Sequence, residues 1–107
     1  MLAPALLALA IASEVLGTVA LRMSDGFSKP LPSVGAVVGY VLAFALLAPV
    51  LKELDIGLVY AIWAGVGTAL IAVIGVLAWD EPAGTIKVLS IGAVIVGVIG
   101  LNLSSAH

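Results

Sequence analysis

The sequence predicts an all-α membrane protein of four transmembrane helices, and three observations support this. Of the 107 residues, 64% are hydrophobic and 9% are charged, and the mean hydropathy is +1.35, far more apolar than a soluble domain. The apolar residues form four long runs, each with about the 20 residues needed to cross a hydrocarbon layer. Four such runs use nearly the whole chain, so we expect one four-helix transmembrane domain over residues 1–107.

The first predicted span covers residues 2–21 and is followed by a loop from Arg22 to Ser33. It lacks the basic start of a secretion signal, exceeds the length of an apolar signal core and carries an acid in its middle, so we interpret it as a mature helix. The second span, residues 34–51, has no charge and ends at residues 52–55. Such a short connection predicts an antiparallel neighbour.

The third run, residues 56–79, contains no charge and is long enough to span with a tilt or a bend. Trp79 ends it, and we expect this side chain at the membrane interface. The fourth run, residues 86–103, contains one charged residue, Lys87, close to its start. There the aliphatic stem of the lysine can reach back to the headgroups.

Composition argues against several functional classes. The four basic residues are scattered and form no patch for nucleic acid. The sequence has no cysteine, and its one histidine is the final residue, His107, which we interpret as part of the tail. No pairing of nucleophile and base, metal cluster or phosphate loop is recognisable, so we expect neither an enzyme nor a cofactor.

Glu14 is the candidate functional residue, because it lies in the middle of the first span. An ionised carboxylate at such a depth costs at least about 2.5 to 3.5 kcal/mol on insertion scales, and acids in spans usually serve ion or substrate pathways. The nearest basic residue of the same segment, Arg22, is eight residues further on. We therefore expect a proton or an incoming cation to neutralise Glu14. Gly17 and Thr18 share its helix face and leave space for a ligand.

Aromatic residues in two other spans complete a candidate site. Tyr60 and Trp63 are three residues apart in the third span, and Tyr40 and Phe44 are four apart in the second, so each pair shares a helix face. Aromatic faces attract cations, and each contact contributes on the order of 0.5 to 2 kcal/mol. An acid combined with these aromatics indicates a site for a lipophilic cation. The alternative for the pair in the third span is anchoring at the interface.

Small residues recur on one face of the fourth span. They are Ser90, Ala93, Gly97, Gly100 and Ser104. Helices in lipid associate through close packing at such stripes, so the stripe predicts either a dimer seam or packing within one chain. A similar stripe in the second span, Gly35, Gly39 and Ala43, is expected to be used inside the protomer.

The basic residues give a weak preference for one orientation in the membrane. Arg22, Lys29 and Lys87 fall on one side, against Lys52 and the terminal amine on the other. A chain with so small a bias could insert both ways, and two opposed copies would form an inverted repeat of the kind that transporters use. The distribution of basic residues therefore leads us to the hypothesis of dual topology.

Several segments together resemble one known family. They are Ala-Ser-Glu-Val-Leu-Gly-Thr at 12–18, Asp-Gly-Phe at 25–27 leading into Pro-Ser-Val-Gly at 32–35, Tyr-Ala-Ile-Trp-Ala-Gly-Val-Gly at 60–67, and Gly97 with Asn-Leu-Ser at 102–104. The chain resembles the small multidrug resistance family of bacterial proton-coupled exporters, without gaps over nearly its entire length. The resemblance implies a multi-pass protein of the bacterial plasma (inner) membrane.

The resemblance also implies an antiparallel homodimer, in which Glu14 of both protomers binds either protons or one hydrophobic cation. Tyr40, Tyr60 and Trp63 would line the pocket. The family's fourth helix makes most of the dimer contact, and Gly65 with Gly67 corresponds to the bend of its third helix. Ser90 departs from the expected glycine, which bears on the details of the seam.

Two positions indicate the branch of the family. Guanidinium-exporting relatives usually carry tryptophan where this chain has Gly17, and lysine where it has Asn102. The chain is thus similar to the multidrug branch, which exports quaternary ammonium ions. If proton and drug compete for one carboxylate pair, the proton gradient drives export. The alternatives are a guanidinium or polyamine exporter, and a non-transporting membrane subunit in which Glu14 handles protons alone.

Overall fold

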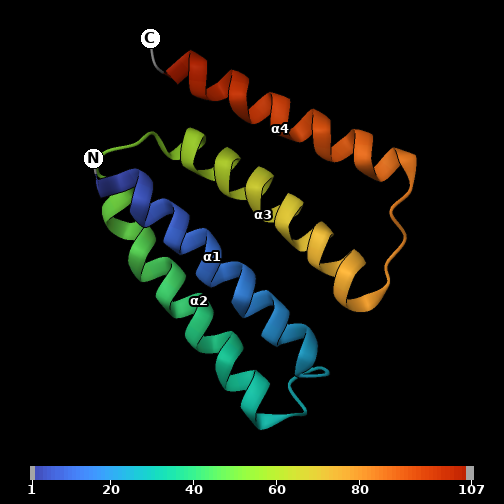
Figure 1. The fold of residues 1–107 in the computed structure, drawn as a ribbon. Coiled ribbons are helices and arrows are strands. Elements are labelled where there is room, and N and C mark those ends of the chain that lie inside the picture. The colour runs from blue at the N-terminus through green and yellow to red at the C-terminus, as the bar shows by residue number, and fades with distance from the viewer. Residues whose placement is uncertain (1, 106–107) are drawn as a thin grey trace. The chain divides into compact units, whose positions relative to one another are not determined.

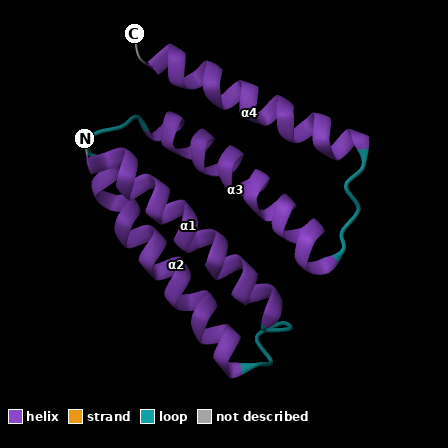
Figure 2. Cartoon of the chain, in the orientation of Figure 1, coloured by secondary structure: helices purple, strands orange, loops and turns teal. Residues whose placement is uncertain are grey.

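The computed structural model describes residues 2–105 and consists of four α-helices joined by short loops (Figure 1). All regular secondary structure in this described part of the chain is helical (Figure 2). The helices are α1 (Leu2–Met23), α2 (Pro30–Val50), α3 (Ile56–Trp79) and α4 (Thr85–Ser105). Each is long and apolar enough to cross a membrane, which confirms the expectation of four apolar helices of membrane length. His107 lies outside the described residues.

The chain divides into two compact units, Met1–Leu54 with α1 and α2, and Asp55–His107 with α3 and α4. Figure 1 shows α1 and α2 running side by side as an antiparallel pair. The short loop between them fixes that arrangement, because two helices joined by a few residues must fold back on each other. The prediction of one four-helix domain stays a prediction.

The helix α2 begins at Pro30, four residues before the predicted start of the second span at residue 34. A proline at the first helical position loses no hydrogen bond, because the N–H it lacks would have no partner there, and its fixed φ suits a helix. The prolines that we interpreted as part of a loop therefore form the first turn of α2. The loop shortens to residues 24–29.

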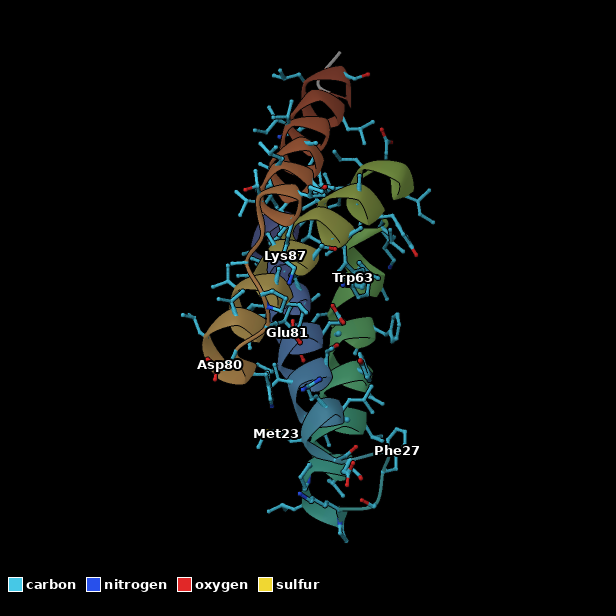
Figure 3. All side chains as sticks on the ribbon, turned by 90° about the vertical axis from the view of Figure 1, so that its right-hand side faces the viewer. Met23, Phe27, Trp63, Asp80, Glu81 and Lys87 are labelled. Carbon is cyan, nitrogen blue, oxygen red and sulfur yellow. The ribbon has the colours of Figure 1, made fainter. Side chains whose placement is uncertain are left out.

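A tight turn connects α1 to α2 in this first unit. Ser24 is fully buried, and its hydroxyl donates to the Leu21 carbonyl at 2.6 Å and accepts from the Phe27 amide at 3.0 Å. Asp25, Gly26 and Phe27 all have positive φ, at 50°, 71° and 66°. The turn leaves the Phe27 side chain 61% exposed near the end of the hairpin, on the other side of the ribbon from Met23 (Figure 3).

In the second unit, α3 ends at Trp79, and the capping residue Asp80 adopts a left-handed conformation with φ 52°. The Glu81 amide then donates to the Gly75 carbonyl at 3.1 Å and so satisfies one of the last carbonyls of the helix. The α3 and α4 pair meets at Gly65, where a Cβ atom would lie 2.6 Å from Val98 Cγ2 and 3.2 Å from Val94 Cγ1. The absent side chain of Gly65 is what lets these two helices approach.

Candidate functional site

The helix α1 carries the acid with a hydroxyl one turn beyond it. Glu14 and Thr18 are four residues apart, so both side chains lie on one face of the helix. The Thr18 hydroxyl donates to Glu14 Oε1 at 2.8 Å, and both residues are half-buried. A hydroxyl that donates to a carboxylate forms a charge-assisted hydrogen bond, which is stronger than a bond between neutral groups. Thr18 therefore holds one oxygen of Glu14 in place.

The helix α2 adds a second hydroxyl to this pair. Tyr40 Oη lies 2.7 Å from Thr18 Oγ1. Thr18 has a single hydroxyl proton, and with that proton on the Glu14 side it can only accept from Tyr40. The three oxygens thus form a chain in which Tyr40 donates to Thr18 and Thr18 donates to Glu14. The structure brings these three predicted site residues together within the first unit.

Two glycines set the distance between α1 and α2 that allows these hydrogen bonds to form. A Cβ atom at Gly39 would lie 2.7 Å from the Cα of Gly17, and a Cβ atom at Gly17 would lie 3.3 Å from the Ala36 carbonyl oxygen. The backbones of α1 and α2 are therefore in direct contact at this level. Thr18 and Tyr40 directly follow the two glycines in the sequence, which explains why their hydroxyl groups meet.

Ser13 adds a hydrogen bond at the same contact, because its hydroxyl donates to the Gly39 carbonyl at 2.9 Å. A helical carbonyl has two lone pairs and can accept this bond beside its own intrahelical one. The sequence reasoning missed Ser13, although a small polar residue next to Glu14 was a visible signal. The prediction that Gly39 and Ala43 pack inside the protomer is confirmed, since Gly39 contacts Gly17 and Ala43 is fully buried.

The surroundings of Gly17 differ from the expectation that it leaves open space beside the acid. Gly17 is buried, and the backbone of α2 lies in close contact with the position that a Cβ atom of residue 17 would take. Within this unit, Gly17 serves the acid by letting α2 come close enough for Tyr40 to reach Thr18.

Phe44, the other aromatic of α2, is 59% exposed. It follows Tyr40 by four residues and so shares its side of the helix. The described hydrogen bonds connect Glu14 with Tyr40 through Thr18, and Phe44 extends the same face of α2 with an aromatic ring. Its part in a binding site stays a prediction.

The remaining predicted site residues lie in the second unit, on α3. Tyr60 is 73% exposed, and Trp63, which is labelled in Figure 3, is half-buried. The two predicted hinge residues, Gly65 and Gly67, are buried, and α3 continues through both as one helix. That these aromatics join Glu14 in one pocket, and that the glycines form a hinge, stay predictions.

The stripe of small residues on α4 is exposed along its described length. A Cβ atom at Gly97 or Gly100 would meet nothing within 4 Å. The helix packs against α3 through Val94 and Val98, and these valines follow the positions of the stripe by one residue, which turns them about 100° away from it around the helix. Packing inside the second unit thus leaves the stripe uncovered. Its other members, Ser90, Ala93 and Ser104, are exposed as well.

No group of three or more histidine, cysteine, aspartate or glutamate side chains within residues 2–105 could hold a metal ion. The chemistry that the described geometry offers is that of a carboxylate with hydroxyl partners inside an apolar helix pair. Such a group can exchange a proton or pair with a cation.

Comparison with known proteins points to one family. Residues 3–95 match the family model of the Small Multidrug Resistance protein. The chain is 46% identical to multidrug resistance protein EbrB of Bacillus subtilis over 94% of its own length and 86% of that protein. It is 48% identical to the nicotine metabolites export pump subunit NepA of Paenarthrobacter nicotinovorans, over 95% and 88%. It is 41% identical to multidrug resistance protein Mmr of Mycobacterium tuberculosis, over 92% of each chain.

Proposed function

Because the chain belongs to the small multidrug resistance family, whose members are multi-pass membrane transporters and not enzymes, we propose that it is a proton-coupled antiporter. It exports hydrophobic cations, quaternary ammonium ions among them, in exchange for protons. The observation that carries the proposal is Glu14 in the middle of a membrane-length helix, bonded to Thr18, which in turn bonds Tyr40. The names of two relatives as multidrug resistance proteins support export of drugs.

Coupling follows from competition for one carboxylate. A proton and a cationic drug each neutralise Glu14, and neutralisation is what makes an acid tolerable in an apolar environment. Binding of one therefore excludes the other. A gradient of protons then drives the drug in the opposite direction, with no separate coupling device.

The proposed cation pocket combines Glu14 with the aromatic residues of α2 and α3. Tyr40 is already fixed beside the acid by its bond to Thr18. Trp63, Tyr60 and Phe44 would supply aromatic faces, which attract a desolvated cation and accept its flat apolar groups. Exposure of Tyr60 and Phe44 in the single chain is compatible with a pocket that a second copy completes.

We assign the second copy to the exposed stripe of α4. Gly97 and Gly100 offer bare backbone over which another helix can approach closely, which is how helices associate in lipid. The weak bias of the basic residues allows the two copies to insert in opposite directions. Gly65 and Gly67 on α3 would provide the bend that lets identical chains exchange shapes and open the pocket to alternate sides.

The test is binding of radiolabelled tetraphenylphosphonium to the purified protein across pH, with Glu14→Gln beside it. The wild type should lose affinity on acidification. Glu14→Gln should lose on the order of 100-fold or more in affinity, because it leaves a buried cation without its counter-charge. Glu53→Gln, at an exposed acid in the loop after α2, is the matched control and should behave as the wild type. Retention of pH-dependent binding by Glu14→Gln would overturn the proposal.

A second substrate class is favoured by one relative, which is named as a subunit of an export pump for nicotine metabolites. A guanidinium or polyamine exporter is the other candidate of the same kind. Competition of nicotine metabolites, guanidinium and polyamines against tetraphenylphosphonium separates these classes. A non-transporting membrane subunit would bind protons at Glu14 and fail to export any cation from vesicles.

A further inference from the structure

We infer that Thr18 and Tyr40 form a chain of hydroxyl groups that is hydrogen-bonded to Glu14. The direction in which these hydroxyl groups donate reverses when Glu14 changes between its ionised and its protonated form. With Glu14 ionised, Tyr40 presents only oxygen lone pairs to an incoming ligand, and with Glu14 protonated it presents an O–H donor. The inference rests on the proposed function, in which Glu14 takes up protons and cations in turn. Thr18 is then a positioning residue, because protonation of Glu14 changes the orientation of the Tyr40 hydroxyl through the hydrogen bonds of Thr18.

The direction of the chain in the ionised state follows from counting protons. A carboxylate can only accept hydrogen bonds, whereas a threonine hydroxyl has one proton and a tyrosine hydroxyl has one. The contact of 2.8 Å at Glu14 Oε1 uses the proton of Thr18, and the contact of 2.7 Å at Tyr40 uses the proton of Tyr40. Both protons are then committed toward the acid, and the far side of Tyr40 Oη carries lone pairs alone.

Protonation of Glu14 at the oxygen that contacts Thr18 reverses this order. The new carboxyl O–H becomes the donor, Thr18 accepts it and turns its own proton to Tyr40, and Tyr40 accepts with its oxygen. The proton of Tyr40 is then turned away from Thr18. One proton is added to the chain, the two hydroxyl groups rotate, and no bond between heavy atoms breaks. An acid proton in an apolar environment needs an acceptor, and Thr18 is positioned as one.

The reversal adds a second reason for proton and drug to exclude each other. Oxygen lone pairs attract a cation, and they accept an N–H group where the cation has one, whereas an O–H group turned toward a cation repels it. Tyr40 thus favours cation binding when Glu14 is ionised and opposes it when Glu14 is protonated. Tyr40 is also the titratable group that α2 brings to Glu14 in this unit. The other charged residues of residues 2–54 lie in the last turn of α1 or in the loops, at Arg22, Asp25, Lys29, Lys52 and Glu53.

Because α1 and α2 are in close contact, the hydrogen bonds that connect Glu14 with Tyr40 run directly through the Thr18 hydroxyl. Gly17 and Gly39 fix the backbones at van der Waals distance, so the two hydroxyl groups stay within hydrogen-bond range without a bridging water. Valine has nearly the shape of threonine and lacks the hydroxyl, and serine keeps the hydroxyl without the methyl group. These two substitutions therefore separate the hydrogen bonds of Thr18 from its packing.

The test is infrared difference spectroscopy of the wild-type protein in phosphatidylcholine vesicles during a pH step. The carboxylic C=O band of Glu14 is assigned by its loss in Glu14→Gln, and the C–O band of Tyr40 by its loss in Tyr40→Phe. We expect both bands to change over the same pH range in the wild type and in Thr18→Ser. In Thr18→Val the Glu14 band should persist and the Tyr40 change should vanish. Its affinity for tetraphenylphosphonium at high pH should fall on the order of 10-fold.

The outcomes separate this inference from the proposed function. A Glu14 band that appears without any change at Tyr40 in the wild type overturns the hydroxyl chain and leaves the antiporter proposal standing. A Tyr40 change that survives in Thr18→Val also overturns the chain. Absence of any Glu14 protonation band overturns the proposed function instead. The wild-type spectrum decides the first point even if Thr18→Val fails to fold.

Discussion

Within Met1–Leu54, α1 and α2 meet backbone to backbone at Gly17 and Gly39, whereas within Asp55–His107, α3 and α4 meet where Gly65 faces two valine side chains. The first pair is reinforced by the bonds of Ser13 and Thr18 to groups of α2. In the second pair, no side chain of α4 that the structure describes is buried. Equally apolar helices are thus packed to very different degrees.

The difference shows that similar apolarity does not make two helix pairs pack equally closely. Burial of apolar surface does not drive helices together in lipid, so close association depends on where small residues and hydrogen bonds lie. In the first unit those features bring Thr18 to Tyr40 and so build the surroundings of the acid. In the second unit the small residues of α4 lie beside the valines that contact α3, and packing within this unit leaves them uncovered.

The largest effect is expected from Gly39→Ala. Its Cβ atom would lie 2.7 Å from Gly17 Cα and 3.0 Å from both Gly17 N and the Ser13 carbonyl oxygen, and these are backbone atoms that cannot turn aside. The helices must separate, which costs about 1 to 3 kcal/mol and breaks the contact between Thr18 and Tyr40. Thermal unfolding in detergent and binding of tetraphenylphosphonium measure both losses.

The matched control for this substitution is Gly92→Ala on α4, where a Cβ atom meets nothing within 4 Å. It should unfold at the temperature of the wild type or slightly above, because alanine favours a helix over glycine. Wild-type stability and binding in Gly39→Ala would show that the close contact of α1 and α2 is dispensable.

An intermediate effect is expected from Gly97→Val. A Cβ atom at Gly97 meets nothing within 4 Å in the described part of the second unit, so packing of α4 against α3 should be unaffected, while a helix of a second copy would lose its close approach. We expect dimerisation in vesicles to weaken on the order of 10-fold, since each 1.4 kcal/mol changes an equilibrium tenfold. Single-molecule photobleaching at varied protein density measures this. Gly92→Val, on another face of α4, is the control, and equal dimerisation by both variants would exclude the stripe as the seam.

The smallest effect is expected at the contact of α3 with α4, from Gly65→Ala together with Val98→Ala. The single Gly65→Ala change places Cβ 2.6 Å from Val98 Cγ2 and should lower stability, and shortening Val98 should restore it. Transport by the double variant should remain about 2- to 5-fold slow, because alanine has less backbone freedom than glycine by about 0.5 to 1 kcal/mol. Uptake of tetraphenylphosphonium into vesicles measures the rate. A full return of transport would show that Gly65 provides space for packing and no hinge.

Much of the fold was predictable because it depends on properties that follow the sequence directly. The four apolar runs, the acid within the first run and the short loops are visible without any partner helix, and they lead to the four helices observed. The bond between Glu14 and Thr18 was accessible in the same way, since residues four apart share a helix face. The start of α2 was misplaced by four residues because prolines mark loops as readily as first turns of helices.

The sequence by itself determined that the chain is helical, apolar and built around one acid in a span, because length, hydropathy and helical spacing are local quantities. Only the tertiary structure decided that Gly17 faces Gly39 and that the hydroxyl groups of Thr18 and Tyr40 meet within hydrogen-bond distance. Helices that are hydrophobic on all sides carry no polar face to show how they are rotated against each other. That rotation is set by which small residues and hydroxyl groups fit together at close range, and it exists only once two helices are in contact.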